Sequence, residues 1–206
     1  MKKNIEIEIR GPLSKNEYTE IKAFFDINAE KVEVKDRILI DYSRTTQGDM
    51  SERKKDIRLR VTNGVPEIII KLGSWGEHEQ RKELSVTTPP GTFDALTEIF
   101  AALGYEKGVL CIRKSHVYIF KNIEFALVEV PQHSYFYEAE KMADENEDAE
   151  KLMNEMKAIC AELGLKVFDK NGFFSYVEKL NKEANEQFDI LAVKENYFKE
   201  RFGLSS

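Results

Sequence analysis

Long charged side chains alternate with apolar ones in several short segments of this 206-residue chain. Near the N-terminus, Glu6, Glu8 and Arg10 occupy alternate positions, and isoleucines fill the positions between them. Successive side chains of a β-strand point to opposite faces, so the charged groups share one face and the isoleucines share the other. A sheet of such strands has one apolar face that must be covered and one face of long charged groups of both signs.

The same spacing recurs later in the chain with defined chemistry. Arg58 and Arg60 stand two apart within 57–61, and Glu138 and Glu140 stand two apart within 136–140. Carboxylates bind hard cations such as Mg²⁺. Arginines bind phosphate oxygens with a forked geometry. If these groups meet on one inner surface, they make a metal-dependent polyphosphate site.

Alternation, β-branched residues and turn residues predict eight strands and five helices. The strands are expected near 3–10, 36–42, 56–62, 66–72, 79–87, 109–119, 123–130 and 135–142. The helices are expected near 14–27, 92–103, 144–164, 172–186 and 189–202. Ser14, with Glu17 three residues later, predicts a capping box for the first helix.

Two architectures fit the charged strand faces. In the first, the charged face is in water and carries weak ion pairs between neighbouring strands. In the second, the sheet closes into a barrel with its charged face inward, and about eight strands suffice to enclose one small ligand. The apolar alternates and the amphipathic helices suit the second architecture, because the helices would cover an apolar exterior.

Composition narrows the class of protein. Apolar residues at 42% and charged residues at 33% are typical of a globular domain, and a net charge of -6 argues against a general nucleic-acid binder. Cys111 and Cys160 form no disulfide framework and are expected to be buried thiols in a reducing cytosol. No apolar run suggests a secretion signal or a membrane span, so we expect a cytoplasmic protein without a membrane partner.

The order of the charged motifs resembles the CYTH superfamily, also called the triphosphate tunnel metalloenzymes, over residues 3–180. The motifs are Glu-x-Glu-x-Arg at 6–10, Leu-Arg-Val at 59–61, Lys71 at a strand end and Glu-x-Glu at 138–140. The superfamily includes the class IV adenylate cyclases and the thiamine triphosphatases. The resemblance implies an α+β fold, a closed eight-stranded antiparallel barrel with helices packed outside. We expect this tunnel domain to span 1–186, with a helical C-terminal extension at 187–206 that docks, dimerises or plugs one tunnel mouth.

The resemblance also implies roles for individual residues. Mg²⁺ or Mn²⁺ would be held by four carboxylates: Glu6, Glu8, Glu138 and Glu140. The residues expected to act in catalysis are Glu6, Glu8 and Arg10. The residues expected to bind the triphosphate are Arg10, Arg58, Arg60, Lys71, Arg81 and, in a sixth strand whose register is open, Arg113 or Lys114. Glu83 is a further candidate.

Some positions depart from the superfamily pattern. Arg10 stands where a lysine is usual, and Ser85 replaces a glutamate of the fifth strand. Val128 falls where a metal-binding aspartate is expected, and strand alternation aims the adjacent Glu129 at the opposite face unless a bulge intervenes. The resemblance therefore supports one metal site more firmly than two.

Three functions follow from this pattern. The first is metal-dependent hydrolysis of a small triphosphate: inorganic tripolyphosphate, a nucleoside triphosphate or thiamine triphosphate. It is favoured because it needs only a polyphosphate grip and an activated water. The second is a class IV-type adenylate cyclase, which must also bind adenine and orient a ribose. The third is non-catalytic binding of polyphosphate or a nucleotide, which the valine at position 128 suggests. A homodimer is compatible with each.

Overall fold

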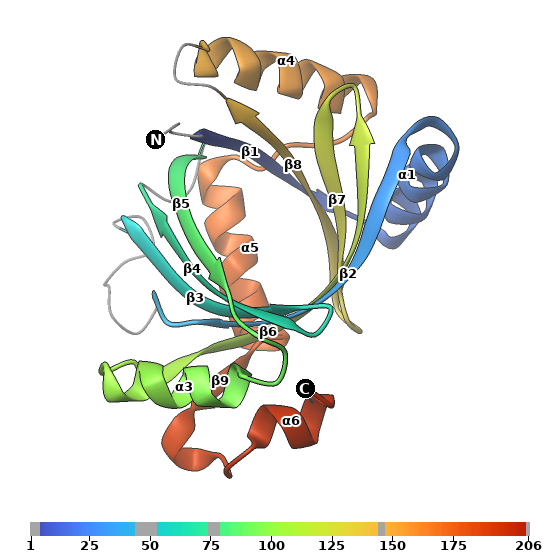
Figure 1. Cartoon of the computed structure of the whole chain (residues 1–206). Coiled ribbons are helices and arrows are strands. Elements are labelled where there is room, and N and C mark those ends of the chain that lie inside the picture. The colour runs from blue at the N-terminus through green and yellow to red at the C-terminus, as the bar shows by residue number, and fades with distance from the viewer. Residues whose placement is uncertain (1–4, 44–52, 74–78, 144–146, 205–206) are drawn as a thin grey trace.

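Nine strands form one antiparallel sheet in the computed structural model, which describes residues 5–43, 53–73, 79–143 and 147–204. The sheet order is β2-β3-β4-β5-β1-β8-β7-β6-β9, and an additional β2–β6 pairing closes the first eight strands into a barrel (Figure 1). The strands are β1 (Ile5–Leu13), β2 (Glu30–Asp41), β3 (Lys55–Thr62), β4 (Val65–Leu72), β5 (Glu79–Thr87), β6 (Lys107–Phe120), β7 (Ile123–Val130), β8 (Ser134–Ala143) and β9 (Glu186–Asp189). The predicted closed eight-stranded barrel is thus confirmed.

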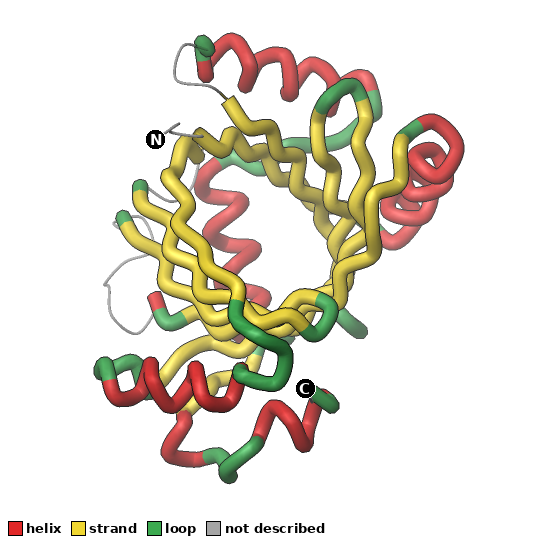
Figure 2. Tube along the Cα trace, viewed as in Figure 1, coloured by secondary structure: helices red, strands yellow, loops and turns green. Residues whose placement is uncertain are grey.

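Helices lie outside the barrel wall or across its end (Figure 2). They are α1 (Lys15–Asn28), α3 (Phe93–Ala102), α4 (Ala149–Glu162), α5 (Lys170–Glu183), the short 3-10 helix η2 (Ile190–Ala192) and α6 (Tyr197–Phe202). The predicted capping box is present on α1, since the Glu17 amide donates to Ser14 Oγ at 3.2 Å and the Ser14 amide donates to Glu17 Oε2 at 2.7 Å. No described helix is long and apolar enough to cross a membrane.

Strand register decides which of the two architectures is correct. Glu8 lies opposite Glu140, and Arg10 lies opposite Glu138, across the β1–β8 pair. Paired residues of an antiparallel ladder place their side chains on the same face. Because the sheet closes with these side chains in its interior, the charged face is the inner one, and the alternative of a solvated charged face is excluded.

The apolar outer face is buried under helices in two clusters. On the β1–β8–β7 side, Ile7 and Ile9 pack with Phe25 of α1 and Met156 of α4. On the β2–β3 side, the core is formed by barrel residues, α3 and the C-terminal segment: Ile40, Leu59, Phe100, Phe188 and Phe198. Both cysteines are buried and free. The helices therefore fix the wall from outside and leave the interior to charged groups.

The predicted helix over 189–202 is wrong. Residues 186–189 instead form β9, which pairs with Lys107–Leu110 of β6, and only α6 is an α-helix in this segment. The first half of β6 has no partner from β7, so β9 satisfies its backbone hydrogen bonds. Asp94 of α3 then accepts hydrogen bonds from the amides of Phe198 and Lys199 at 2.9 and 3.0 Å, which holds α6 against the barrel exterior.

Candidate functional site

A cavity of about 370 Å³ lies inside the barrel and receives side chains from all eight barrel strands. Its charged lining residues are Glu6, Glu8, Arg10, Lys35, Arg37, Arg58, Arg60, Lys71, Glu83, Arg113, Glu124, Glu138 and Glu140. Ten of the predicted site residues are in this set; Arg81 and Lys114 are not. The closure of the sheet thus brings together residues that are far apart in the sequence.

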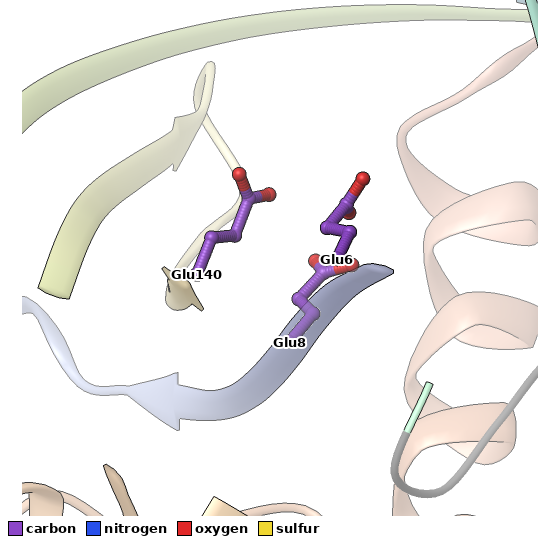
Figure 3. Close-up of side chains that lie close together, drawn as sticks. All are labelled: Glu6, Glu8 and Glu140. Carbon is purple, nitrogen blue, oxygen red and sulfur yellow. The ribbon is translucent and has the colours of Figure 1, made fainter. Parts of the chain in front are cut away.

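A carboxylate cluster forms one wall of the cavity. Glu6, Glu8 and Glu140 each offer a carboxylate oxygen, and these oxygens lie within 4.8 Å of one another (Figure 3). Glu6 and Glu8 come from β1, and the β1–β8 register brings Glu140 beside them. Glu138, the fourth predicted ligand, also lines the cavity, but it forms an ion pair with Arg10 at 3.3 Å.

Electrostatics within this carboxylate cluster favour a cation. Burial raises the pKa of Glu140 to about 7, and repulsion from Glu138 and Glu6 adds to the effect. Burial likewise raises the pKa of Glu8, although Arg10 opposes the rise. The Oε2 atom of Glu8 lies 2.5 Å from Arg10 Nη2, but it is buried and accepts no hydrogen bond from the described residues. Three hard oxygen ligands at this spacing, two of them on carboxylates that burial makes harder to ionise, fit a divalent cation such as Mg²⁺ or Mn²⁺.

Cations line β2 and β3, the strands opposite β1 and β8 in the closed barrel, and Lys71 of β4 and Arg113 of β6 lie at the sides. Several are already held by neighbours: Lys71 Nζ lies 2.6 Å from Glu6 Oε1, and Arg60 Nε donates to Glu67 Oε1 at 2.6 Å. The charges of Glu8 and Glu6 outweigh burial and raise the pKa of Lys71, which keeps it protonated. A wall of cations opposite a wall of carboxylates suits a ligand that carries both a metal ion and phosphate oxygens.

Arg81 lies on the inner face, opposite Glu6 across the β1–β5 pair, but does not line the cavity. It is 2% exposed, and its Nη1 donates to Asp56 Oδ2 at 2.6 Å. Asp56 is fully buried and also forms ion pairs with Arg53 at 3.0 Å and Arg58 at 2.7 Å. Despite burial, Arg58, Arg53 and Arg81 together lower the pKa of Asp56 to about 2. Asp56 therefore ties the start of β3 to β5 and orients Arg58 toward the cavity.

The register of the sixth strand is now defined. Arg113 lines the cavity and donates to Asn185 Oδ1 at 2.7 Å. Lys114 points to the outer face, where its Nζ lies 3.8 Å from Asp36. Of the two residues left open by the sequence, Arg113 is the one in position to bind a ligand.

Sequence reasoning missed three charged cavity residues: Lys35, Arg37 and Glu124. Lys35 and Arg37 have the same alternate spacing as the recognised motifs. However, β2 begins at Glu30, six residues before the predicted start, so Lys35 lies outside the predicted strand. Glu124 is the second residue of β7 and pairs with Glu140 in register. For Lys35 the available signal was charge alternation extended by one residue before the predicted strand, whereas Arg37 and Glu124 lie within predicted strands.

The β7 wall is apolar where a further carboxylate was expected. Val128 lines the cavity and packs with Val117, Ala126 and Phe136. Glu129 pairs with the outward-facing Lys114, and β7 runs without a register shift against β6 and β8. The expectation that Glu129 points away from the cavity is therefore confirmed.

Helix α5 covers one end of the barrel (Figure 1). Its Phe173 ring centroid lies 4.9 Å from the guanidinium carbon of Arg10, and its Tyr176 hydroxyl lies 2.9 Å from Ser134 Oγ. The Tyr176 ring also packs edge-on against Phe136 of the cavity lining. The element at this mouth is α5, whereas α6 docks on the exterior beside α3.

The fold and the site define a closed antiparallel tunnel whose interior sets carboxylates against cations. The family model of the CYTH domain matches residues 4–172, and the chain belongs to this family. The PH1819 protein from Pyrococcus horikoshii OT3 has a similar structure, with a TM-score of 0.66 and 20% identity over 84% of this chain and 98% of that one.

Two further solved structures share the fold. A putative adenylate cyclase from Vibrio parahaemolyticus aligns with a TM-score of 0.57 and 12% identity over 79% of this chain and 90% of that one. A putative adenylyl cyclase from Hippeastrum, described as revealing a dominant triphosphatase activity, aligns with a TM-score of 0.53 and 14% identity over 80% and 89% of the two chains. No curated protein sequence gives a significant match. At these identities the likeness concerns the fold.

Proposed function

We propose that this protein hydrolyses a small triphosphate in a reaction that depends on Mg²⁺ or Mn²⁺. The observation that carries the proposal is the carboxylate cluster of Glu6, Glu8 and Glu140 facing a cationic wall across one cavity. Membership of the CYTH family and the activity described for the Hippeastrum protein support it.

The chain's own residues would divide the work. Glu6, Glu8 and Glu140 would hold the divalent cation, which when bound neutralises phosphate charge and lowers the pKa of a water. Arg58 and Arg60 would grip phosphate oxygens, and Asp56 and Glu67 fix the directions of these two guanidinium groups. Phosphoryl transfer depends mainly on such positioning and charge stabilisation.

Arg10 has a role distinct from that of a base. Its guanidinium lies between Glu8 at 2.5 Å and Glu138 at 3.3 Å and under the ring of Phe173. An arginine stays protonated at any physiological pH, so it cannot accept a proton from water. Arg10 would instead stabilise charge on the phosphoryl group, and the carboxylates around it would accept the proton.

The test is a panel of tripolyphosphate, ATP and thiamine triphosphate with Mg²⁺, Mn²⁺ or EDTA, in which phosphate, pyrophosphate and cyclic AMP are measured. We expect phosphate release that requires the metal and is lost in Glu140→Gln. The matched control is Glu129→Gln, the same change on the outward face of β7. Cyclic AMP and pyrophosphate from ATP would identify a cyclase instead.

Non-catalytic binding is the second candidate, because Val128 leaves the β7 wall apolar. In that case tripolyphosphate would bind without any phosphate release, even at saturating metal concentration.

A further inference from the structure

Arg37 differs from the other arginines of the cavity. It lies on the inner face of β2, opposite Arg113 on one side and Thr62 on the other. Its side chain forms no hydrogen bond or ion pair with any residue that the structure describes, and its Nε is buried without an acceptor. Arg60 has Glu67 as its partner, and Arg113 has the Asn185 amide oxygen.

Such an arrangement is unfavourable in the absence of a ligand. The Nε of Arg37 is removed from water without an acceptor, so it loses hydration that nothing replaces. Burial and repulsion from Arg60 lower the pKa of Arg37, and the charges of Glu138, Glu140 and Glu67 only partly offset them. A bound ligand explains an arginine in this position better than the stability of the barrel does.

The surroundings of Arg37 define the ligand chemistry. Arg60 and Arg113 stand on the neighbouring strands, so this part of the wall carries several guanidinium groups. Of the carboxylates that act on Arg37, Glu67 already pairs with Arg60, and Glu138 already pairs with Arg10. An arginine fork matches two oxygens of a phosphoryl group. The carboxylate cluster that would hold the metal lies in the same cavity.

We propose that Arg37, which belongs to none of the motifs that identify the family in this sequence, binds a phosphoryl oxygen of the triphosphate directly. The inference rests on the proposed function, because it assigns one more contact to the same ligand. Direct ligand binding by Arg37 predicts a different result from a purely structural role. Removing the charge should weaken ligand binding and, at the same time, leave the ligand-free protein as stable as before or more stable.

The test compares Arg37→Gln with Lys114→Gln, which removes one positive charge from the outer face of the adjacent strand β6. Tripolyphosphate binding is measured by calorimetry with Mg²⁺ present, and thermal unfolding is measured without ligand. We expect Arg37→Gln to weaken binding by about 10-fold to 100-fold, the equivalent of losing one charge-assisted hydrogen bond. We expect its ligand-free melting temperature to equal or exceed that of the wild type, and Lys114→Gln to change binding by less than about twofold.

Two results would overturn the proposal: unchanged affinity in Arg37→Gln, or a ligand-free variant that is clearly less stable or unfolded. Arg37→Lys keeps the charge but loses the fork, so an intermediate affinity supports direct binding. If the wild type binds tripolyphosphate without hydrolysing it, the proposed hydrolysis fails while the role of Arg37 stands. If the wild type binds no tripolyphosphate, both fail.

Discussion

The pKa of Glu140 makes the ligand-free protein sensitive to pH in a predictable direction. The folded state raises this pKa from the ordinary 4.5 to about 7, so it holds the proton more tightly than the unfolded state does. One pKa unit corresponds to about 1.4 kcal/mol, and the shift therefore amounts to about 3 kcal/mol. This contribution to the free energy of unfolding is fully present below pH about 4.5 and is lost as pH rises through about 7.

Urea denaturation in EDTA between pH 5 and pH 8 measures this effect in wild type, Glu140→Gln and the control Glu129→Gln. We expect the free energy of unfolding of Glu140→Gln to lack this loss at high pH. At pH 8 it should exceed that of the wild type by up to about 3 kcal/mol, while the free energy of unfolding of Glu129→Gln should follow the wild type. Some slope should remain in Glu140→Gln, because burial also raises the pKa of Glu8. In the wild type, excess Mg²⁺ should remove most of the loss of unfolding free energy at high pH, because the metal binds the ionised carboxylates and displaces the proton. Parallel pH profiles for wild type and Glu140→Gln in EDTA would refute the reasoning.

Three other changes have separable effects. Asp56→Asn leaves the arginines around that buried carboxylate without their counter-charge and should lower the free energy of unfolding by about 3–5 kcal/mol, measured by urea denaturation. Phe198→Ala opens a cavity between α6 and α3 and should cost about 3–5 kcal/mol in the same assay, while tripolyphosphate affinity measured by calorimetry stays unchanged. Glu138→Gln removes a partner of Arg10 and no member of the carboxylate cluster, so it should reduce Mn²⁺ affinity, followed by electron paramagnetic resonance, less than Glu140→Gln does.

Local alternation in the sequence predicted much of this site because a strand fixes its side-chain directions without help from the rest of the fold. Glu6, Glu8, Arg58 and Arg60 all lie on the inner face that their spacing indicates. Arg37 has the same spacing from Lys35, but its neighbours depend on long-range pairing. It lies beside Arg113 because β2 pairs with β6 and closes the barrel, and this pairing leaves no mark in the local sequence.

The C-terminal segment shows the opposite failure. Residues 189–202 carry apolar side chains at helical spacing, but the open side of β6 offers backbone partners to residues 186–189, and Asp94 caps the helix that starts at Tyr197. Tertiary hydrogen bonds at two fixed points thus divide a segment whose own periodicity favours one helix. The sequence alone predicts neither the pairing of β9 with β6 nor the hydrogen bonds from α6 to Asp94, because both depend on the tertiary fold.

The two walls of the tunnel share one thermodynamic property. Burial, with added repulsion between carboxylates, raises the pKa of Glu8 and Glu140 on the acidic wall, and burial lowers the pKa of Arg37 on the basic wall. These three groups therefore disfavour their own charge in the ligand-free protein. If the proposed ligands bind, a metal ion on the carboxylates would relieve Glu8 and Glu140, and a phosphoryl group would relieve Arg37. Because the metal also binds phosphate oxygens, each ligand should strengthen the binding of the other by the same factor. On the proposed function, a metal-bound triphosphate would offset the unfavourable burial of Glu8, Glu140 and Arg37 together.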